Sequence, residues 1–153
     1  MLVGVISDTH GLMRVEALDA LRGSDLIIHA GDIGRPDLLE QLRAIAPVFA
    51  VRGNVDKQDW ADKLPDTQIV SVGAYKFYVL HDISQLSMDP VQAGIAAVIF
   101  GHSHKPSTET RDGVLYLNPG SAGPRRFNLP ICLARVVVSN NRIEPSLVHL
   151  NVR

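Results

Sequence analysis

The stretch that decides the fold is Leu2-Val3-Gly4-Val5-Ile6, followed at once by Ser7-Asp8-Thr9-His10-Gly11. The first five residues form a short apolar run that contains β-branched side chains, and this predicts a buried strand. The polar residues that follow are typical of a loop that leaves the carboxyl end of a strand. Ligands bind at such ends in open α/β sheets, so this loop is the first candidate for a binding site.

The same alternation recurs twice downstream. Apolar runs at 26–29 and 48–51 predict two further strands, which end in Ala30-Gly31-Asp32 and in Arg52-Gly53-Asn54. Between the strands, helical spacing relates Val15, Leu18 and Leu21, and also Leu38, Leu39, Leu42 and Ile45. A βαβαβ order of this kind predicts a mostly parallel sheet with helices packed on it.

The second half of the chain is richer in strands. We expect strands at 69–72, 76–80, 97–100, 108–111, 114–117, 131–138 and 143–150, and one short helix at 90–95. Hairpin turns are predicted at Asp112-Gly113 and Asn140-Asn141. The expected architecture is a two-sheet α/β sandwich with helices outside.

Composition places the chain among globular proteins. Its 153 residues argue for one domain over 1–153, and 46% hydrophobic with 20% charged residues is an ordinary balance for a folded core. Fifteen Lys and Arg against sixteen Asp and Glu give a net charge of −1, which provides no electrostatic case for nucleic-acid or membrane binding. A small phosphate substrate needs only local positive charge and stays compatible with this balance.

Targeting signals and disulfides are not expected. Cys132 is the single cysteine, so no internal disulfide can form. The N-terminal residues lack a basic segment and meet Asp8 early, which argues against a signal peptide. No apolar run approaches the roughly 18 residues of a membrane span. We therefore expect a cytoplasmic protein, and a homo-oligomer is left open.

Five polar clusters begin where a predicted strand ends. They are Asp8-Thr9-His10, Gly31-Asp32, Gly53-Asn54-Val55-Asp56, His81-Asp82 and Gly101-His102-Ser103-His104. In extended chain, residues two apart point to the same side, so Asp8 with His10 and His102 with His104 are expected to face one cavity. The glycines allow close approach of the backbone just before the candidate ligands.

Together these clusters predict a dinuclear metal site. Seven side chains could hold two metals about 3.5–4 Å apart: Asp8, His10, Asp32, Asn54, His81, His102 and His104. Carboxylate, amide and imidazole ligands suit Mn, Fe, Zn or Ni, with Mn expected in vitro. Each piece alone also fits a turn, a helix cap or a surface histidine, and the shared context of all five favours metal.

Other polar residues fit structural roles. His29 lies inside an apolar strand and is expected to be a hydrogen-bonded core histidine, and His149 and Cys132 are assigned to strands. Asn118-Pro119-Gly120-Ser121 predicts a tight turn whose backbone could lie near the site. Arg125 and Arg126 fit either a phosphate contact or an exposed loop.

In their order, the five clusters resemble the motifs of calcineurin-like metallophosphoesterases. The short length and Asn118-Pro119-Gly120-Ser121 resemble the small YfcE-like phosphodiesterase branch, which is similar in fold to a retromer subunit. The resemblance covers essentially the whole chain and implies a four-layer αββα sandwich. It also implies a ligand division: Asp8, His10, Asp32 and His104 for one metal, and Asp32, Asn54, His81 and His102 for the other, with Asp32 as the bridge.

Two positions depart from the family pattern. Many larger relatives carry a histidine directly after the Asn of the third motif, where it helps to protonate the leaving group. Here that residue is Val55, so Asp56 loses a ring to orient and a structural role in the loop is expected. Asp82 follows His81 where many relatives have glycine, and it fits either support of a ligand imidazole or a helix cap.

These observations predict a phosphoesterase, with a phosphodiester favoured over a monoester. A hydroxide that bridges the two metals would attack phosphorus in line, with Asp32, Asn54, His81 and His102 as the catalytic residues. The expected substrate is a small phosphoester. The alternative from another class is an interaction module that keeps the fold with metal binding reduced or structural, as in the retromer subunit.

Overall fold

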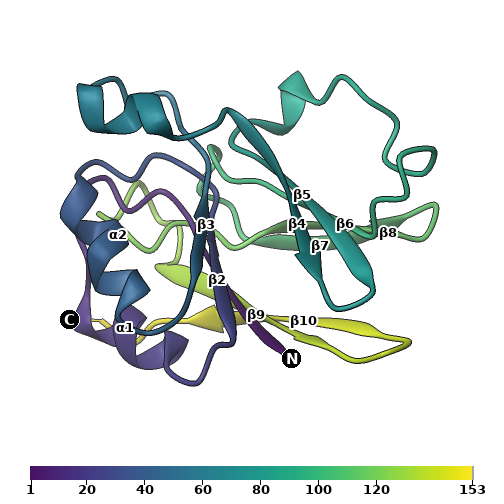
Figure 1. Cartoon of the computed structure of the whole chain (residues 1–153). Coiled ribbons are helices and arrows are strands. Elements are labelled where there is room, and N and C mark those ends of the chain that lie inside the picture. The colour runs from purple at the N-terminus through teal and green to yellow at the C-terminus, as the bar shows by residue number, and fades with distance from the viewer. Residues whose placement is uncertain (153) are drawn as a thin grey trace.

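Two five-stranded sheets pack face to face in the computed structural model, which describes residues 1–152 (Figure 1). The largest apolar cluster lies between them and joins Val5 and Ile28 of one sheet to Phe77, Ile99 and Leu117 of the other. The two-sheet α/β architecture is thus confirmed.

The first sheet has the strand order β10-β9-β1-β2-β3. Its strands are β1 (Leu2–Ile6), β2 (Leu26–His29), β3 (Val48–Ala50), β9 (Cys132–Val138) and β10 (Ile143–His149). β1, β2 and β3 run parallel, as the βαβαβ pattern predicts, and β9 pairs antiparallel with both β1 and β10. Because Ile6 pairs with His29, the loops that follow β1 and β2 leave the sheet side by side.

The second sheet has the order β4-β5-β6-β8-β7. Its strands are β4 (Thr67–Val72), β5 (Tyr75–Leu80), β6 (Ala97–Ile99), β7 (Ser107–Arg111) and β8 (Val114–Asn118). β5, β6 and β8 are parallel, and the edge strands β4 and β7 are antiparallel to their neighbours. Each sheet therefore contains three parallel strands whose carboxyl ends share one edge.

Two α-helices cover the outer face of the first sheet. They are α1 (Val15–Leu21) and α2 (Pro36–Arg43), and they lie on the same side of that sheet (Figure 1). Leu21 of α1 and Leu42 of α2 are fully buried against Ile6 and Ile27. α2 begins with Pro36 in its first turn, a position that proline favours because it needs no backbone N–H there.

The outer face of the second sheet is covered without an α-helix. The segment between β5 and β6 contains the short 3₁₀ helix η2 (Ile83–Gln85) and turns, and it packs its apolar side chains on Leu80 and Val98. The helix predicted at 90–95 is wrong: one α-type bond joins Ala93 N–H to the Asp89 carbonyl, and Gly94 then turns the chain at φ 72°. One helical turn does not offset the cost of nucleation. A second 3₁₀ helix, η1 (Asp59–Lys63), was not predicted.

The remaining structural assignments can be placed. Cys132 is fully buried in β9, as expected, and burial raises the pKa of its thiol to about 11. His149 ends β10 on the surface. Within the described residues, neither α1 nor α2 nor any 3₁₀ helix is long and apolar enough to cross a membrane.

Candidate metal centre

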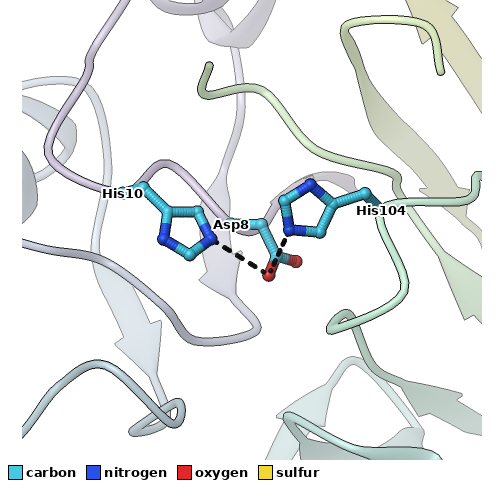
Figure 2. Close-up of side chains that lie close together, drawn as sticks. All are labelled: Asp8, His10 and His104. Atoms are coloured by element: carbon cyan, nitrogen blue, oxygen red, sulfur yellow. Dashed lines mark ion pairs between the residues drawn. The ribbon is translucent and has the colours of Figure 1, made fainter. Parts of the chain in front are cut away.

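Loops from both sheets meet at the carboxyl ends of the parallel strands. They bring two groups of potential ligand atoms to within 4.8 Å of one another. The first group is Asp8, His10 and His104, and the second is Asp8, Asp32 and His81. In Figure 2 the rings of His10 and His104 approach the same carboxylate oxygen of Asp8 from opposite sides.

Asp8 is completely buried and its two carboxylate oxygens have different surroundings. Oδ2 accepts hydrogen bonds from the Ser7 hydroxyl at 2.7 Å and from the His102 N–H at 3.1 Å. Oδ1 faces three imidazoles, with the Nε2 atoms of His104, His10 and His81 at 3.3, 3.8 and 3.8 Å. The hydrogen bonds to Oδ2 therefore fix the side chain, and Oδ1 faces the centre.

Asp32 repeats this division. Its Oδ1 accepts a hydrogen bond from the Val55 N–H at 3.0 Å, and its Oδ2 faces His81 Nε2 at 3.1 Å and His10 Nε2 at 3.6 Å. One oxygen, Oδ2, is thus shared between a histidine of each predicted metal. The bridging role of Asp32 stays a prediction, because Asp8 Oδ1 faces histidines of both predicted metals in the same way and Asp8 is the residue that the two groups share.

The His81 ring shows why the cluster suits a cation. Its Nδ1 lies 2.7 Å from the Ala30 carbonyl, which can only accept, so Nδ1 carries the proton and Nε2 presents a lone pair to Asp32. A lone pair facing a carboxylate is unfavourable unless a proton or a metal ion lies between them. Among the described residues, Asp8 Oδ1, His10 Nε2 and His81 Nε2 are buried and lack any hydrogen-bond partner. The donor set therefore fits a divalent metal.

The pKa directions express the same electrostatics. The Asp8 carboxylate is the main reason that the pKa of His10 is raised. Burial alone would lower the pKa of His81, but Asp32 and Asp8 outweigh it and the pKa is raised. The carboxyls behave conversely: burial opposes ionisation, yet the histidines hold the pKa values of Asp8 and Asp32 below their usual range. The centre therefore attracts positive charge.

The backbone at the ligands differs from the expected extended form. Positive φ angles occur at Asp8 (56°), His10 (46°), Asp32 (56°), His102 (72°) and His104 (63°). The explanation of convergence by strand-like alternation is therefore wrong, because these loops turn through left-handed conformations. Asp and His are enriched among the non-glycine residues that adopt this region, and such strain gathers at functional sites.

Two glycines permit the close packing that was expected of them. A Cβ at Gly53 would collide with the backbone nitrogen and Oδ1 of Asp32. A Cβ at Gly101 would collide with the hydroxyl of Ser7 and would lie 2.5 Å from Asp8 Oδ2. Any side chain at these positions would displace a carboxylate.

His102 and Asn54 lie at the margin of the cluster. The rings of His102 and His81 are 5.3 Å apart between centroids, and His102 Nε2 is 3.9 Å from Asp82 Oδ2. Asn54 is exposed and lines a hollow of about 400 Å³ together with His81 and Asp82. Neither residue belongs to the two compact groups, so their ligand roles stay predictions.

Asp82 has the capping role considered for it, and its support of a ligand imidazole stays a prediction. Its Oδ1 accepts hydrogen bonds from the N–H and hydroxyl of Ser84 and so caps η2. Burial opposes ionisation of this carboxyl, but the bonds from Ser84 outweigh it and lower its pKa. The other oxygen, Oδ2, faces His102.

Asp56 has the structural role expected for it. Its carboxylate accepts hydrogen bonds from the backbone N–H groups of Ile33, Gly34 and Gly53, at 2.9 to 3.1 Å. It therefore ties the loop that carries Asp32 to the loop that carries Asn54.

His29 is also structural, as predicted. It is fully buried, and its Nδ1 accepts the Gly31 N–H at 3.1 Å, so Nε2–H donates to the Thr9 hydroxyl at 3.0 Å. That hydroxyl in turn donates to the Ile33 carbonyl. The chain of bonds joins the loops after β1 and β2.

Sequence reasoning missed three residues that hold the ligand loops in place. Ser7 orients Asp8, and Ser121 donates from its hydroxyl to the Asp8 carbonyl at 2.9 Å. Asn118, fully buried, donates to the Gly101 carbonyl and to the Ser103 hydroxyl, both at 3.1 Å. The turn at 118–121 was expected near the site, and its polar side chains were the available signal.

Comparison with known proteins agrees with this geometry. Residues 1–141 match the model of the calcineurin-like phosphoesterase superfamily domain. A probable metallophosphoesterase of Methanothermobacter thermautotrophicus is 34% identical over 142 residues, which cover 85% of this chain and 82% of that protein. A phosphodiesterase of Methanocaldococcus jannaschii is 27% identical over 138 residues, which cover 78% of this chain and 83% of the relative.

A solved structure shares the whole fold. Vps29 of Chaetomium thermophilum superimposes with a TM-score of 0.78 over 99% of this chain and all of the other, at 18% identity. At that identity the likeness concerns the fold alone. The family match over 1–141, the relatives and the buried His/Asp cluster together show that this chain belongs to the calcineurin-like phosphoesterase superfamily.

Proposed function

We propose that this protein is a phosphodiesterase that uses two divalent metal ions. The observation that carries the proposal is the set of buried atoms without partners, Asp8 Oδ1, His10 Nε2 and His81 Nε2, which face two carboxylates. Buried polar groups normally find hydrogen bonds, and three such atoms in one place need a cation to satisfy them.

The predicted division of ligands is compatible with the two groups. Asp8, His10 and His104 would hold one metal, and His81 with the marginal Asn54 and His102 would hold the other. Asp32 would serve both through Oδ2, since that atom faces a histidine of each set. Mn is the proposed metal in vitro, because the ligands are oxygen and nitrogen atoms without sulfur.

Each residue has a defined task in this proposal. Two bound cations would supply a lowered pKa for a coordinated water and neutralise charge that develops on the phosphoryl oxygens. The protein fixes the carboxylates by Ser7 and by the Val55 N–H, so that they need not reorganise during the reaction. Ala30 fixes the proton of His81 on Nδ1 and so keeps Nε2 available as a ligand.

A diester is the favoured substrate because the chain resembles the small phosphodiesterase branch of the family, and the chain lacks the histidine that serves as an acid in larger relatives. Val55 occupies that position with its side chain partly exposed, and Asp56 is engaged by backbone amides. The phosphodiesterase of M. jannaschii supports the same ester type. The small hollows beside the centre are compatible with a small phosphoester.

The alternative is an interaction module of the same fold. The likeness to Vps29 is compatible with it only at the level of the fold. The intact cluster of Asp8, Asp32 and three histidines argues against it, since a scaffold needs no convergent buried ligands.

The test is metal-dependent turnover of bis-(p-nitrophenyl) phosphate. Protein stripped with a chelator should be inactive, should regain activity with Mn²⁺, and should bind up to two metals per chain by elemental analysis. Asp19→Asn, an exposed change on α1, serves as a control that keeps activity. Full activity after verified metal removal, or no turnover of any phosphoester with metals bound, would contradict the proposal.

A further inference from the structure

Positive charge is distributed unevenly around the metal centre. Six arginines of residues 1–152 pair with acidic side chains: Arg22, Arg35, Arg43, Arg52, Arg111 and Arg142. Within the same range, Arg14, Arg125, Arg126 and Arg135 have no acidic partner. Three of these four lie on or against the segment 123–126.

That segment borders a hollow next to the first ligand group. The hollow has a volume of about 350 Å³ and is lined by His10, His104, Pro124, Arg125 and Arg126. Both arginines are exposed, so their guanidinium groups can reach a ligand. Asp8 and Asp32 do not line the hollow, which therefore adjoins the centre rather than containing it.

Arg14 contacts the backbone of this segment. Its guanidinium donates to the Gly123 carbonyl at 3.3 Å, and its Nε is buried without a partner. This contact fixes the backbone just before Pro124 and adds a third uncompensated charge.

The hollow that contains His81 has a more balanced charge. It is lined by Asn54, His81, Asp82, Asp66, Arg52 and Lys57, among others. Arg52 is neutralised there by Asp66 at 2.9 Å and faces Asp62 at 3.8 Å. Asp82 adds a further negative charge. An anion beyond the scissile group would therefore be attracted more strongly to the arginine side, where none of the described acidic side chains lines the hollow.

We propose that the hollow lined by Arg125 and Arg126 is a subsite for a second phosphate group of the substrate. The inference rests on the proposed function and narrows it to phosphodiesters that carry an additional phosphate. Guanidinium groups bind phosphate oxygens through two parallel N–H donors, and two adjacent arginines match the charge of a phosphate dianion. The ester group that departs, which carries no charge in the intact substrate, would lie in the hollow lined by Asn54.

A matched pair of substrates tests this subsite. The 5′-p-nitrophenyl esters of thymidine 5′-phosphate and of thymidine 3′,5′-bisphosphate differ only in the remote 3′-phosphate. With Mn²⁺-loaded wild type, we expect the bisphosphate ester to have a KM about 10- to 100-fold lower at low salt, the range for one or two charge-assisted contacts. This advantage should shrink as ionic strength rises.

Variants connect the advantage to the arginines. The double variant Arg125→Gln with Arg126→Gln should lose most of the discrimination, while kcat and KM for the monophosphate ester change less than about two-fold. The control is Arg22→Gln with Arg43→Gln, which removes the same charge from exposed positions on and beside the helices. The control should leave the discrimination intact.

A binding measurement separates this inference from the proposed function. Titration calorimetry compares thymidine 5′-phosphate with thymidine 3′,5′-bisphosphate on Mn²⁺-loaded protein, and it needs no turnover. If no diester is hydrolysed, the proposed function fails, and a bisphosphate preference lost in the Arg125/Arg126 variant still supports the subsite. Equal binding of the two nucleotides by wild type overturns the subsite. An equal loss for both substrates in the variant also overturns it, because the arginines would then act on the scissile phosphate.

Discussion

The ligand loops of the two sheets contribute different chemistry to one centre. The loops after β1 and β2 supply both buried carboxylates, Asp8 and Asp32, together with His10. The loops after β5 and β6 supply only imidazoles, His81, His102 and His104. Both sets of loops follow parallel strands and lie at the same edge of the two sheets. They differ in the contacts that hold the loops in place.

The first sheet holds its loops more tightly. The loops lead toward α1 and α2, and the chain of bonds from His29 through Thr9 joins them to each other. Asp56 ties the loop after β2 to the loop after β3. Such support is needed because each carboxylate opposes ionisation of its neighbour: the charge of Asp8 raises the pKa of Asp32 against the stronger lowering by His81. The loops of the second sheet lead to no α-helix in the described residues, and residues 101–103 are tied by the side chains of Asn118 and Asp8. Substitutions in the ligand loops of the first sheet should therefore reduce metal binding and activity more than substitutions in those of the second sheet.

The largest effect is expected for Asp32→Asn. The amide nearly preserves shape but removes the charge that faces both His10 and His81. We expect loss of at least one metal and a decrease in kcat/KM of roughly 10³-fold or more, about 4 kcal/mol. His102→Ala should cost less, because that ring is 43% exposed at the margin of the cluster. Metal content and turnover of both variants decide the comparison, and near-normal activity with two metals in Asp32→Asn would remove the bridging assignment.

The second prediction concerns the support of the first-sheet loops. Burial lowers the pKa of His29 to about 4, whereas the unfolded chain titrates near 6.5. Between these two pH values His29 is protonated in the unfolded state but not in the folded state. The free energy of unfolding therefore falls as the pH decreases from 6.5 towards 4. This group should contribute about 2–3 kcal/mol to the loss of unfolding free energy between pH 7 and pH 4.5.

His29→Gln removes that contribution. Urea denaturation of metal-free protein at both pH values should show a smaller acid destabilisation in the variant than in wild type. The ligand histidines titrate in both proteins and cancel in the difference. An identical pH dependence in the two proteins would mean that His29 is protonated in the folded state.

The third prediction addresses the second sheet. Asn118→Ala removes both donors that hold Gly101 and Ser103, and it frees the chain that carries His102 and His104. We expect metal affinity to fall about 10- to 100-fold, as for other residues that orient metal ligands. Asn118→Asp keeps the acceptor for the Gly120 N–H but lacks the two donors, so its metal affinity should fall nearly as much.

Chelator competition at a temperature where the variants remain folded measures this effect separately from stability. Asn141→Ala, an exposed change in the turn between β9 and β10, is the matched control. If Asn118→Ala lowered only the unfolding free energy and left metal affinity unchanged, Asn118 would stabilise the fold without positioning the histidines.

Most of the fold could be predicted because its central strands are short apolar runs with polar ends. The exception is instructive: residues 90–95 have helical composition, but they span too few turns between Pro90 and Gly94 to form a helix. The fourth layer of the sandwich is consequently made of turns and η2. Neither η1 nor η2 has a periodic apolar face long enough to detect.

The site was predictable in its residue types and not in its geometry. Strand ends placed Asp8, Asp32 and the histidines at one edge. Their left-handed backbone and the hydrogen bonds from Ser7 and Asn118 depend on contacts between distant segments, such as Ser121 with Asp8, which are 113 residues apart. Local sequence does not encode these contacts, so the strand-like alternation inferred for His102 and His104 failed.

The smallest effect is expected at Val55, in the loop after β3. Without an acid at this position the departing oxygen must leave with more negative charge, so kcat/KM should depend steeply on the leaving-group pKa across a series of diesters. General acid catalysis typically contributes about 10²–10⁴-fold. Val55→His should restore less than this, about ten-fold for alkyl esters, because Asp56 cannot orient the new ring while its oxygens bind the amides of Ile33, Gly34 and Gly53.

Val55→Phe, which adds bulk without a titratable group, is the control and should give no gain for poor leaving groups. The Val55 N–H holds Asp32 Oδ1 through the backbone, so both variants should retain the metals. A flat leaving-group dependence in wild type would show that another residue already supplies the proton. His102 is then the first candidate, because it is half exposed and its Nε2 faces Asp82 Oδ2 at 3.9 Å, and the second sheet would contribute an acid as well as ligands.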